Sequence, residues 1–547
     1  MNIIEKINDL FPSTLTTEEI ESRYKPRPEG QVVTRIAPSP TGMMHIGSVY
    51  AALISERVAH LAKGTFMLRI EDTDSKREVD GATEVIINGL ENFNIISDEG
   101  PTSTGEEKGV YGPYTQSKRR EIYLAYIKQL LEKDLAYPCF CSQGELEEIR
   151  DKQTKQGMRT GYYGDWAKFR KAPKEIVAEH IKKGTPFTIR LKSSGKHFNK
   201  RQFEDLIKGK RNLPENDADI VILKASGLPT YHFAHAIDDH LMGTTHVIRG
   251  DEWLSSLPLH IQLFETLGWK APHFAHISPI EIMDDGKRRK LSKRKDPEAS
   301  VTYYEDKGYP KEAVIEYLMN LANSTFEAFR VENPSESVWN FPFELQKLGR
   351  SGALLDLVKL DSMSRDFIGR LSAQEVYDQL AEWAEHMEPE LFDRMQQNKE
   401  YFINIFKIER EGVERVRKDF ANWSTIWQEL DYFFDDAFTP EHDYIVKITE
   451  QKPEIAKAFL SDFIENYDDT LDNEAWFGNM KELAGKHGFA KNGKIYKKAP
   501  DSYNGTIADA AKMLRIAITG KTQTPDLYSL MMVMGKERVL NRLNSSI

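Results

Sequence analysis

The hydrophobic pattern near the start of the chain predicts a strand, a helix and a second strand. An apolar run at 32–36 is followed, after a loop rich in Pro and Gly, by apolar residues at helical spacing over 46–61. Gly64 ends the helix, and 65–70 is a second apolar run. This order predicts a βαβ unit with a right-handed crossover in a parallel sheet. The loop at His45 would then lie at the N-terminus of the helix, where backbone N–H groups and the helix dipole favour anions.

The pattern changes twice further along the chain. Residues 116–133 carry apolar positions at four-residue spacing, which predicts an amphipathic helix. Residues 136–215 are rich in Lys, Gly and Glu and contain short strand-like runs, which indicates an inserted α/β domain. Strand-like sequence returns at 220–223 and 245–249, and helical patterns dominate the rest of the chain. The pattern therefore predicts an α/β fold followed by a mostly helical region.

Composition and charge describe a globular protein. The 547 residues are 40% hydrophobic and 29% charged, and the formal net charge is −11. We find no apolar run of about eighteen residues and no signal-peptide core, so we expect a cytoplasmic protein with no membrane association. With only two cysteines, Cys139 and Cys141, a disulfide framework is excluded.

Two short segments carry the strongest chemical signal. The first, 35–48, joins the strand to the helix through small residues and ends in His-Ile-Gly-Ser. The second, 290–294, reads Lys-Leu-Ser-Lys-Arg and lies within 287–295, where seven of nine residues are Lys or Arg. Cations beside helix-terminal amides can hold a triphosphate and stabilise the charge that develops when a nucleophile attacks it. Each segment alone also fits a solvated basic loop or a structural histidine.

Together with further motifs, these segments resemble the bacterial-type glutamate–tRNA ligases, a family of class I aminoacyl-tRNA synthetases. The motifs follow the family's order, and the similarity covers nearly everything after residue 30. They lie at 35–42, 45–48, 69–74, 231–235, 238–240, 246–253 and 290–294, with a further matching block at 514–538.

The resemblance implies an ATP site built from the class I signatures "HIGH" and "KMSKS". His45, Lys290 and Lys293 would be catalytic, because an imidazole can hydrogen-bond phosphate oxygens and two lysines can neutralise the leaving pyrophosphate. Magnesium is expected on the phosphates. Trp253 and Met283 also fit a core role. The ATP-binding residues implied are His45, Gly47, Glu252, Trp253, Met283, Lys290, Ser292 and Lys293.

The resemblance also implies a pocket for L-glutamate. Two guanidiniums, of Arg35 and Arg249, suit the two carboxylates of the substrate, and Glu71 suits its ammonium. Both arginines also fit structural ion pairs. His235 stands where the family usually has Asn, and we expect its charge to vary near pH ~6.5. The glutamate-binding residues implied are Arg35, Ala37, Ser39, Glu71, Tyr231, His235 and Arg249.

The two cysteines resemble half of the zinc site that some family members carry in the inserted domain. The second half should fall near 162–168, where Trp166 and Lys168 occupy the ligand positions. Tetrahedral zinc needs four donors. We therefore expect no bound metal, unless His180, His197 or another residue completes a site.

By resemblance, the fold is a class I Rossmann-type catalytic domain with an insertion, followed by a mostly helical anticodon-binding region. The implied partners are tRNA(Glu), L-glutamate and ATP, and we expect a monomer. The expected segments are 1–30, an N-terminal helical extension; 31–135, the first half of the catalytic domain; 136–215, an inserted tRNA acceptor-binding domain; 216–275, the second half of the catalytic domain; 276–345, a stem-contact domain with the Lys-Leu-Ser-Lys-Arg loop; and 346–547, the anticodon-binding region.

Several alternatives share part of this pattern. A glutamine–tRNA ligase has the same catalytic motifs but reads the anticodon with β-barrels, whereas this chain is helical after about 345. A shortened paralogue that glutamylates a modified tRNA base lacks the C-terminal region. A small-molecule adenylyltransferase explains neither the glutamate positions nor the C-terminal half, and an RNA-binding module does not need paired phosphate loops. The sequence leaves open whether tRNA(Gln) is charged as well as tRNA(Glu).

Overall fold

The structure is a computed structural model of the 547-residue chain, and it describes residues 2–13, 15–73, 79–439 and 453–546. Asp74, the last residue of the 69–74 motif, lies outside the described residues. The chain divides into two compact units, each described by itself below. The first comprises Met1–Tyr303 and Ile315–Asp356, and the second comprises Tyr304–Val314 and Leu357–Ile547.

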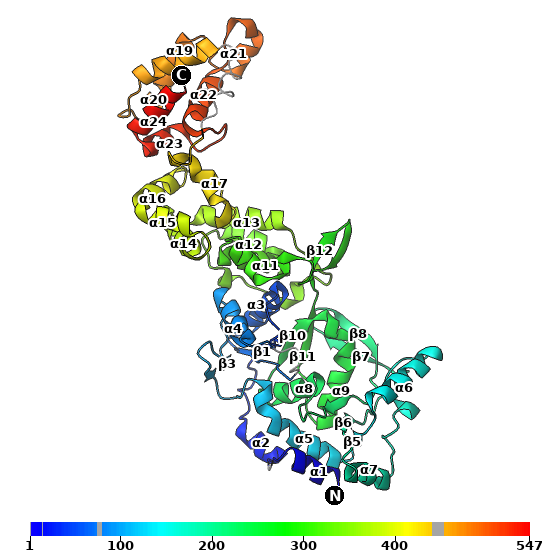
Figure 1. Ribbon diagram of the computed structural model, residues 1–547. Helices are drawn as coiled ribbons and strands as arrows, with labels where there is room; N and C mark the ends of the chain where they lie inside the picture. The colour runs from blue at the N-terminus through cyan, green and yellow to red at the C-terminus, as the bar shows by residue number, and fades with distance from the viewer. Residues whose placement is uncertain (1, 14, 74–78, 440–452, 547) are drawn as a thin grey trace. The chain divides into compact units, whose positions relative to one another are not determined.

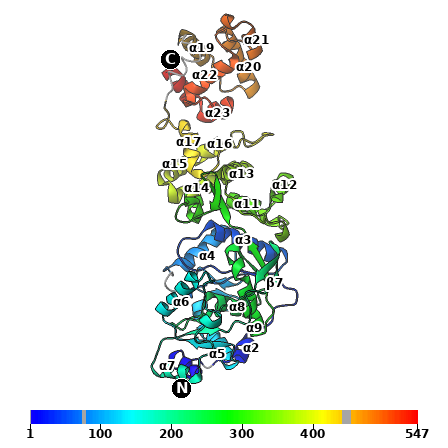
Figure 2. The ribbon, with the colours of Figure 1, turned by 90° about the vertical axis from the view of Figure 1, so that its right-hand side faces the viewer.

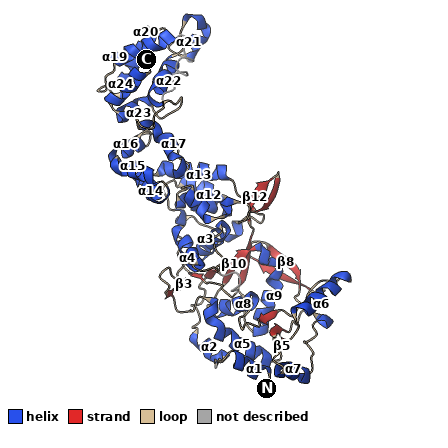
Figure 3. Cartoon of the chain, viewed as in Figure 1, coloured by secondary structure: helices blue, strands red, loops and turns tan. Residues whose placement is uncertain are grey.

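The first unit contains a six-stranded sheet in the order β2-β1-β10-β11-β7-β8 (Figures 1 and 3). All neighbouring strands are parallel except the antiparallel pair β7 and β8. Because β2 and β10 lie on opposite sides of β1, the strand order reverses there, and ligands bind at the carboxyl edge of such a switch point. The strands are β1 (Val33–Ile36), β2 (Thr65–Leu68), β7 (Lys200–Asp205), β8 (Gly209–Pro214), β10 (His246–Gly250) and β11 (His273–Ile277).

The helix after β1 forms as its sequence predicts. Helix α3 (Ile46–Leu61) begins after its N-cap His45 and is apolar around most of its circumference, because it packs on β1, β2 and β10. The predicted helix at 116–133 starts as a 3₁₀ turn, Gln116–Arg119, and continues as α5 (Arg120–Glu132). The other helices around this sheet are α4 (Ala82–Asn92), α8 (Tyr231–Leu241) and α9 (Leu257–Leu267), and a small hairpin joins β3 (Gly100–Pro101) to β4 (Glu107–Lys108).

Strand pairing differs from the segment boundary that we expected at residue 215. Strands β7 and β8 precede that boundary but belong to the main sheet, where β7 pairs with β11. Strand β9 follows it but pairs with β6 in a separate antiparallel sheet, β5-β6-β9. These pairings are non-local, so the local sequence pattern does not report them. The inserted elements are β5 (Ala136–Cys139), α6 (Gln143–Lys155), α7 (Lys174–Lys182), β6 (Thr188–Leu191) and β9 (Val221–Leu223).

The predicted N-terminal helices are present. Helix α1 (Ile3–Leu10) and helix α2 (Thr17–Arg23) each begin with a capping box, in which the cap side chain and a glutamate three residues later satisfy each other's backbone N–H groups. Helix α2 packs on α5 and α1 packs on α7, and these elements lie together in Figures 1 and 2.

The Lys-Leu-Ser-Lys-Arg segment follows a second three-stranded sheet. Its hairpin joins β12 (Ile280–Asp284) to β13 (Lys287–Lys290), and β14 (Ala353–Leu354) pairs in parallel with β12. Arg289 holds the following loop by a bidentate ion pair to Asp296, with N–O distances of 2.6 and 2.7 Å. Helix α12 (Thr325–Glu332) also belongs to this unit, while α10 (Val301–Asp306) and α11 (Lys311–Ala322) each contribute residues to both units.

The elements of the second unit that begin at Leu357 or later are all helical across its described residues (Figure 3). They enclose a large apolar core that includes Phe402, Trp423, Phe459 and Leu514. Along the whole described chain, no helix has the length and apolarity needed to cross a membrane. The helices are α13 (Leu357–Arg370), α14 (Ala373–Met387), α15 (Pro389–Gln397), α16 (Lys399–Lys407), α17 (Ile426–Leu430), α19 (Pro453–Glu465), α20 (Asn473–Lys486), α21 (Gly493–Lys498), α22 (Ile507–Thr519), α23 (Leu527–Met534) and α24 (Lys536–Ser545).

Candidate active site

A pocket of about 510 Å³ lies at the carboxyl ends of β1, β10 and β11 and at the N-terminus of α3. This volume is within the range of pockets that bind small molecules, about 300–1,000 Å³. Most of the predicted site residues line it, together with Thr73, Ser278 and Ile280, which the sequence did not single out. The predicted residues in the lining are Arg35, Ala37, Ser39, His45, Gly47, Glu71, Tyr231, Arg249, Glu252, Trp253 and Lys290.

His45 sits at the N-terminus of α3 in a fixed tautomer. Its Nδ1 accepts a hydrogen bond from the Gly47 N–H at 2.8 Å, so the neutral ring carries its hydrogen on Nε2. A Cβ at position 47 would lie 2.9 Å from that Nδ1, which explains the glycine. Burial lowers the pKa of His45, and the positive charges of Lys293 and Lys290 lower it further. The imidazole is therefore a neutral hydrogen-bond donor at pH 7.

The two signature segments meet in space. The Lys293 Nζ donates to the carbonyl of Met43, two residues before His45, at 2.6 Å. His45 also forms an isolated β-bridge with Ser300. Lys290 lines the pocket and lies 3.5 Å from a carboxylate oxygen of Glu252, measured from Nζ. The ammonium group of Lys290 and the N-terminus of α3 thus face the pocket, and Lys293 holds the loop that precedes this helix.

Arg249 is a buried cation without a carboxylate partner among the described residues. Its Nε donates to His276 Nε2 at 3.0 Å, and His276 in turn bonds Asp205 through Nδ1 at 2.6 Å. Neither of its terminal nitrogens has a hydrogen-bond partner among the described residues, although the side chain is almost fully buried. Burial, followed by the nearby charge of Arg35, lowers the pKa of this guanidinium. An uncompensated buried cation that lines a pocket is suited to an anionic ligand.

The guanidinium of Arg35 forms an ion pair within the protein. Its Nε donates to Asp239 Oδ1 at 3.1 Å, and the same oxygen accepts from Arg69 Nη1 at 2.8 Å. Arg69 also reaches Glu71, with Nη2 3.1 Å from Oε1. The structural ion pair that we considered for Arg35 is therefore present, and the residue lines the pocket as well.

Glu71 lies fully enclosed at the pocket floor. Its Oε1 accepts from Arg69 and lies 3.4 Å from Gln116 Nε2. Burial raises the pKa of Glu71 to about 7, although the charges of Arg69 and Arg35 oppose the shift. A carboxyl group of this kind gains from an arriving cation, because the cation compensates the cost of its charged form.

His235 does not line the pocket, and our expectation about its charge is wrong. It lies buried behind Tyr231, with ring centroids 5.3 Å apart, and its Nδ1 lies 3.2 Å from Asp239 Oδ2. Burial lowers its pKa to about 4 despite Asp239, so the ring is neutral near pH 7. Its Nε2 has no hydrogen-bond partner among the described residues. A neutral donor or acceptor is what the family's usual Asn would also supply.

Three further predicted residues lie outside the pocket lining. Met283 is half exposed on β12, where it is paired with Arg288 of the hairpin. The backbone N–H of Ser292 donates to Asp296 Oδ2 at 2.8 Å. Lys293 points to the loop before His45, as described above.

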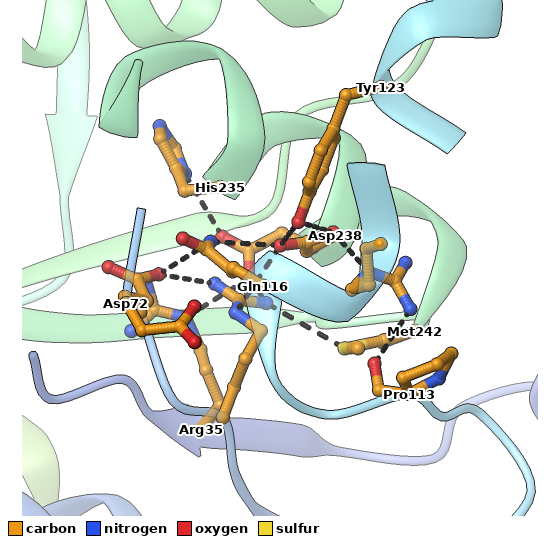
Figure 4. Close-up of polar contacts among 12 residues, drawn as sticks. Arg35, Asp72, Pro113, Gln116, Tyr123, His235, Asp238 and Met242 are labelled. Atoms are coloured by element: carbon orange, nitrogen blue, oxygen red, sulfur yellow. Dashed lines mark hydrogen bonds and ion pairs between the residues drawn. The ribbon is translucent and has the colours of Figure 1, made fainter. Parts of the chain in front are cut away.

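A buried polar network beneath the pocket was not predicted from the sequence. Asp238 accepts hydrogen bonds from Arg119, Tyr123 and Gln116, at 2.7, 2.9 and 2.9 Å. Figure 4 shows Gln116, Tyr123 and Asp238 converging between the strand that carries Arg35 and helix α8. The Asp-Asp pair of α8 was recognised as a motif without a role. A signal was available, since Asp239 follows His235 by four residues and so shares its helix face.

A tyrosine hydroxyl contacts the sulfur atoms of both cysteines. The Tyr162 hydroxyl lies 3.4 Å from the sulfur of Cys139 and 3.5 Å from that of Cys141. His180 instead stacks on Phe140, with centroids 4.7 Å apart. In the described residues, no group of three or more His, Cys, Asp or Glu is arranged to hold a metal ion.

Comparison with known proteins agrees with this geometry. Residues 31–345 match the family described as "tRNA synthetases class I (E and Q), catalytic domain", and residues 501–547 match "Anticodon binding domain". The "Glutamate--tRNA ligase" of Clostridium perfringens (strain 13 / Type A) is 46% identical over 540 residues, covering 98% of this chain and 99% of that protein. That of Clostridium beijerinckii is 46% identical over 546 residues, covering 99% of both.

A solved structure is similar over most of the chain. The glutamate tRNA ligase from Elizabethkingia meningosepticum, crystallised "in complex with its amino acid", has a TM-score of 0.74 and 28% sequence identity, and the match covers 94% of this chain and 99% of that one. Fold, signature segments and family match define a class I synthetase. Within that class, the chain belongs to the glutamate–tRNA ligases.

Proposed function

We propose that this chain attaches L-glutamate to tRNA(Glu) in an ATP-dependent reaction, and that the pocket at the carboxyl edge of the sheet holds both small substrates. The charge of the site supports the proposal most directly. When Glu71 is ionised, three guanidiniums of the ion-paired network balance three carboxylates, and the positive charge of Arg249 is in excess. Glutamate, with two carboxylates and one ammonium, carries the matching excess of one negative charge. The balanced groups are Arg35, Arg69, Arg119, Glu71, Asp238 and Asp239.

The amino-acid end of the pocket is assigned by this charge pattern. Arg249 and Arg35 bind the two carboxylates, because a guanidinium offers paired N–H donors to a carboxylate. Glu71 accepts the ammonium. Tyr231, Ser39 and the backbone at Ala37 line the remaining wall. His235 influences the amino-acid end through its ring contact with Tyr231.

The nucleotide end is assigned to the two signature segments. His45 donates through Nε2 to a phosphate oxygen, and Gly47 lets the nucleotide approach the backbone. Lys290 and Lys293, with Ser292, bind the β- and γ-phosphates. Mg²⁺ would supply further positive charge to these phosphates. Trp253 supplies an aromatic face and Glu252 an acceptor for the nucleoside.

The reaction needs no covalent intermediate with the enzyme. The α-carboxylate of glutamate attacks the α-phosphorus of ATP, the bond to the β-phosphate oxygen breaks, and pyrophosphate leaves with its added negative charge. The 2′-hydroxyl of the terminal adenosine of tRNA then attacks the acyl carbon of glutamyl-adenylate, loses its proton and displaces AMP. The side chains contribute position and electrostatic stabilisation.

The second unit is assigned to recognition of the tRNA, with the protein acting as a cytoplasmic monomer. Its match to an anticodon-binding family begins at residue 501. A small pocket of about 40 Å³ in this unit combines Arg410, Arg417 and Tyr432 with the loop at 523–525, which lies within that match. Residues 136–215 and 276–345 are assigned to the acceptor end and stem of the tRNA.

ATP–pyrophosphate exchange in the presence of tRNA(Glu) tests the assignment of the pocket. Arg249→Ala should greatly weaken the dependence of exchange on glutamate while the KM for ATP changes little. Arg201→Ala removes an exposed, ion-paired arginine of β7 and serves as the matched control. If both variants use glutamate as the unchanged protein does, the assignment of Arg249 is wrong.

A further inference from the structure

The N-terminal segment, residues 2–30, is joined to the pocket floor by a continuous series of hydrogen bonds, which is partly buried at Tyr24 and buried from Arg119 inward. The series begins at Tyr24, just after α2, whose hydroxyl accepts from Arg119 Nη1 at 3.0 Å. Arg119 Nε donates to Asp238 Oδ1 at 2.7 Å. Asp238 Oδ2 accepts from Gln116 Nε2 at 2.9 Å, and the same nitrogen lies 3.4 Å from Glu71 Oε1. Figure 4 shows Gln116 and Asp238 at the centre of these contacts.

Arg119 is the residue of this series that joins the Tyr24 hydroxyl to Asp238. Arg119 and Asp238 are essentially fully buried. Arg119 Nη1 has one other acceptor, the Pro113 carbonyl at 2.9 Å, and its Nη2 has no hydrogen-bond partner among the described residues. Loss of the Tyr24 hydroxyl would therefore leave a buried guanidinium short of acceptors. An unpaired buried donor is costly, so we expect Arg119 to shift and to disturb Asp238, which Tyr123 also holds at 2.9 Å.

Arg27, in the same N-terminal segment, makes a second set of contacts with the elements around the pocket floor. Arg27 forms a bidentate ion pair with Glu99, at 2.6 and 2.9 Å, and its Nε donates to the Met242 carbonyl at the end of α8. Glu99 also accepts from the Tyr114 hydroxyl at 2.9 Å. The Tyr114 carbonyl accepts from the Ile70 N–H at 2.9 Å, directly before Glu71.

The glycine at position 243 is adapted to Arg27. A Cβ at Gly243 would lie 2.5 Å from Arg27 Cγ, and the backbone there has a φ of +68°. The close approach of Arg27 therefore depends on this residue. The N-terminal segment is thus fitted to the catalytic unit rather than loosely attached to it.

We propose that the N-terminal segment positions the amino-acid site, with Tyr24 as a positioning residue that acts on Glu71 through Arg119, Asp238 and Gln116. The inference rests on the proposed role of Glu71 in binding the ammonium of glutamate. It predicts an effect on glutamate and not on ATP, because the signature segments lie outside this series of contacts.

The test compares two substitutions of the same kind at the same interface. Tyr24→Phe removes the link to Arg119. Tyr126→Phe removes a hydrogen bond from α5 to Glu21 of α2, at 2.7 Å, which is not part of the series to Asp238. Steady-state exchange with tRNA(Glu) gives the KM for glutamate, the KM for ATP and kcat for each variant, and thermal unfolding gives Tm.

Tyr24→Phe is expected to raise the KM for glutamate by about fivefold, as for loss of one hydrogen bond, with the KM for ATP unchanged. Tyr126→Phe should leave both KM values within about twofold of the unchanged protein. The double variant Tyr24→Phe with Gln116→Ala should raise the KM for glutamate by less than the product of the two single effects, since both lie in one series of contacts.

The proposal is overturned if Tyr24→Phe matches Tyr126→Phe in the KM for glutamate, or if it lowers Tm alone. It is also overturned if the effects of Tyr24→Phe and Gln116→Ala multiply. Glu71→Gln, measured in parallel, separates this failure from failure of the proposed function. If Glu71→Gln also leaves the KM for glutamate unchanged, then the assignment of the pocket is wrong.

Discussion

Lys293 Nζ lies 2.6 Å from the carbonyl oxygen of Met43, so the basic loop after β13 closes onto the loop before α3. The bond joins the two segments that carry the class I signatures. Its acceptor is a neutral carbonyl, which a phosphate oxygen can replace with a stronger, charge-assisted bond. Burial already lowers the pKa of Lys293, and an arriving phosphate would favour its charged form.

The first prediction follows from this contact. Lys293→Ala should lower the rate of glutamate activation by about 10²-fold, because a cation that stabilises the leaving pyrophosphate is lost, while the KM for glutamate changes little. Pyrophosphate exchange with tRNA present measures both quantities. Lys287→Ala, an exposed lysine of the same basic stretch, is the control. Equal rates for the two variants would remove Lys293 from the catalytic step.

The second prediction separates the two arginines of the amino-acid site. Arg249 has no carboxylate partner among the described residues, whereas Arg35 pairs with Asp239. Arg249→Ala should therefore raise the KM for glutamate by about 10²-fold with little loss of Tm. Arg35→Ala should raise the KM and also lower Tm, because a buried carboxylate loses a partner. A fall in Tm for both variants with unchanged KM would mean that both arginines serve only the fold.

The third prediction concerns pH. Burial raises the pKa of Glu71 to about 7, and only its anion can pair with the ammonium of glutamate. The KM for glutamate should be flat at high pH and rise about tenfold for each unit of pH below 7. A KM that stays constant between pH 6 and 8, with the enzyme still folded, would contradict this role.

The same shift gives a stability prediction of defined sign. A carboxyl group with a pKa of about 7 in the folded state and 4.5 in the unfolded state binds more protons when folded. Its contribution to stability is therefore lost as pH rises from 4.5 to 7. Glu71→Gln should raise Tm at pH 8, measured without ligands, while it weakens glutamate binding. A lower Tm at pH 8 would show that the ion pair with Arg69 outweighs the cost of burial.

The fourth prediction concerns His235. Because burial lowers its pKa to about 4, the ring is neutral in the working range, and His235→Asn should keep the KM for glutamate within about threefold. His235→Lys places a cation at the same buried position and should raise that KM strongly. If His235→Asn removed the rise in KM below pH 7, that rise would belong to His235 and not to Glu71.

The fifth prediction concerns metal. The Tyr162 hydroxyl contacts both cysteine sulfurs, and the described residues bring no further ligands to them, so purified protein should contain less than roughly 0.1 zinc per chain. Cys139→Ser combined with Cys141→Ser should remain active. Elemental analysis decides the question, and stoichiometric zinc with loss of activity in the double variant would identify a metal site.

The local sequence pattern was sufficient to predict the strand and the helix on either side of the first signature segment. The apolar run before His45 and the helical spacing after it predicted β1 and α3, and the structure confirms both. For these two elements the residue propensities, the helix N-cap and the burial of apolar side chains all favour the same local structure. The helical character of the C-terminal region was predicted for the same reason.

The pairing between strands that are distant in the chain could not be predicted from the sequence. Strands β7 and β9 lie on the opposite side of residue 215 from the sheets they join, because their partners are distant in the chain. The network around Asp238 has the same origin, since Arg119 and Gln116 come from another helix. The spacing of four residues between His235 and Asp239 indicated that pair, but the bonds from Arg119 and Gln116 to Asp238 and the burial that neutralises His235 depend on tertiary packing and could not be derived beforehand.

Aminoacylation of purified tRNA with labelled amino acid decides whether this chain charges tRNA(Glu) with glutamate. We expect ATP-dependent labelling of tRNA(Glu) by glutamate and none by glutamine, whose zwitterion lacks the excess negative charge that Arg249 matches. The same assay with tRNA(Gln) shows whether that tRNA is also a substrate for glutamate. Labelling of either tRNA by glutamine, or no labelling of tRNA(Glu) by glutamate, would show that the pocket is not a glutamate site.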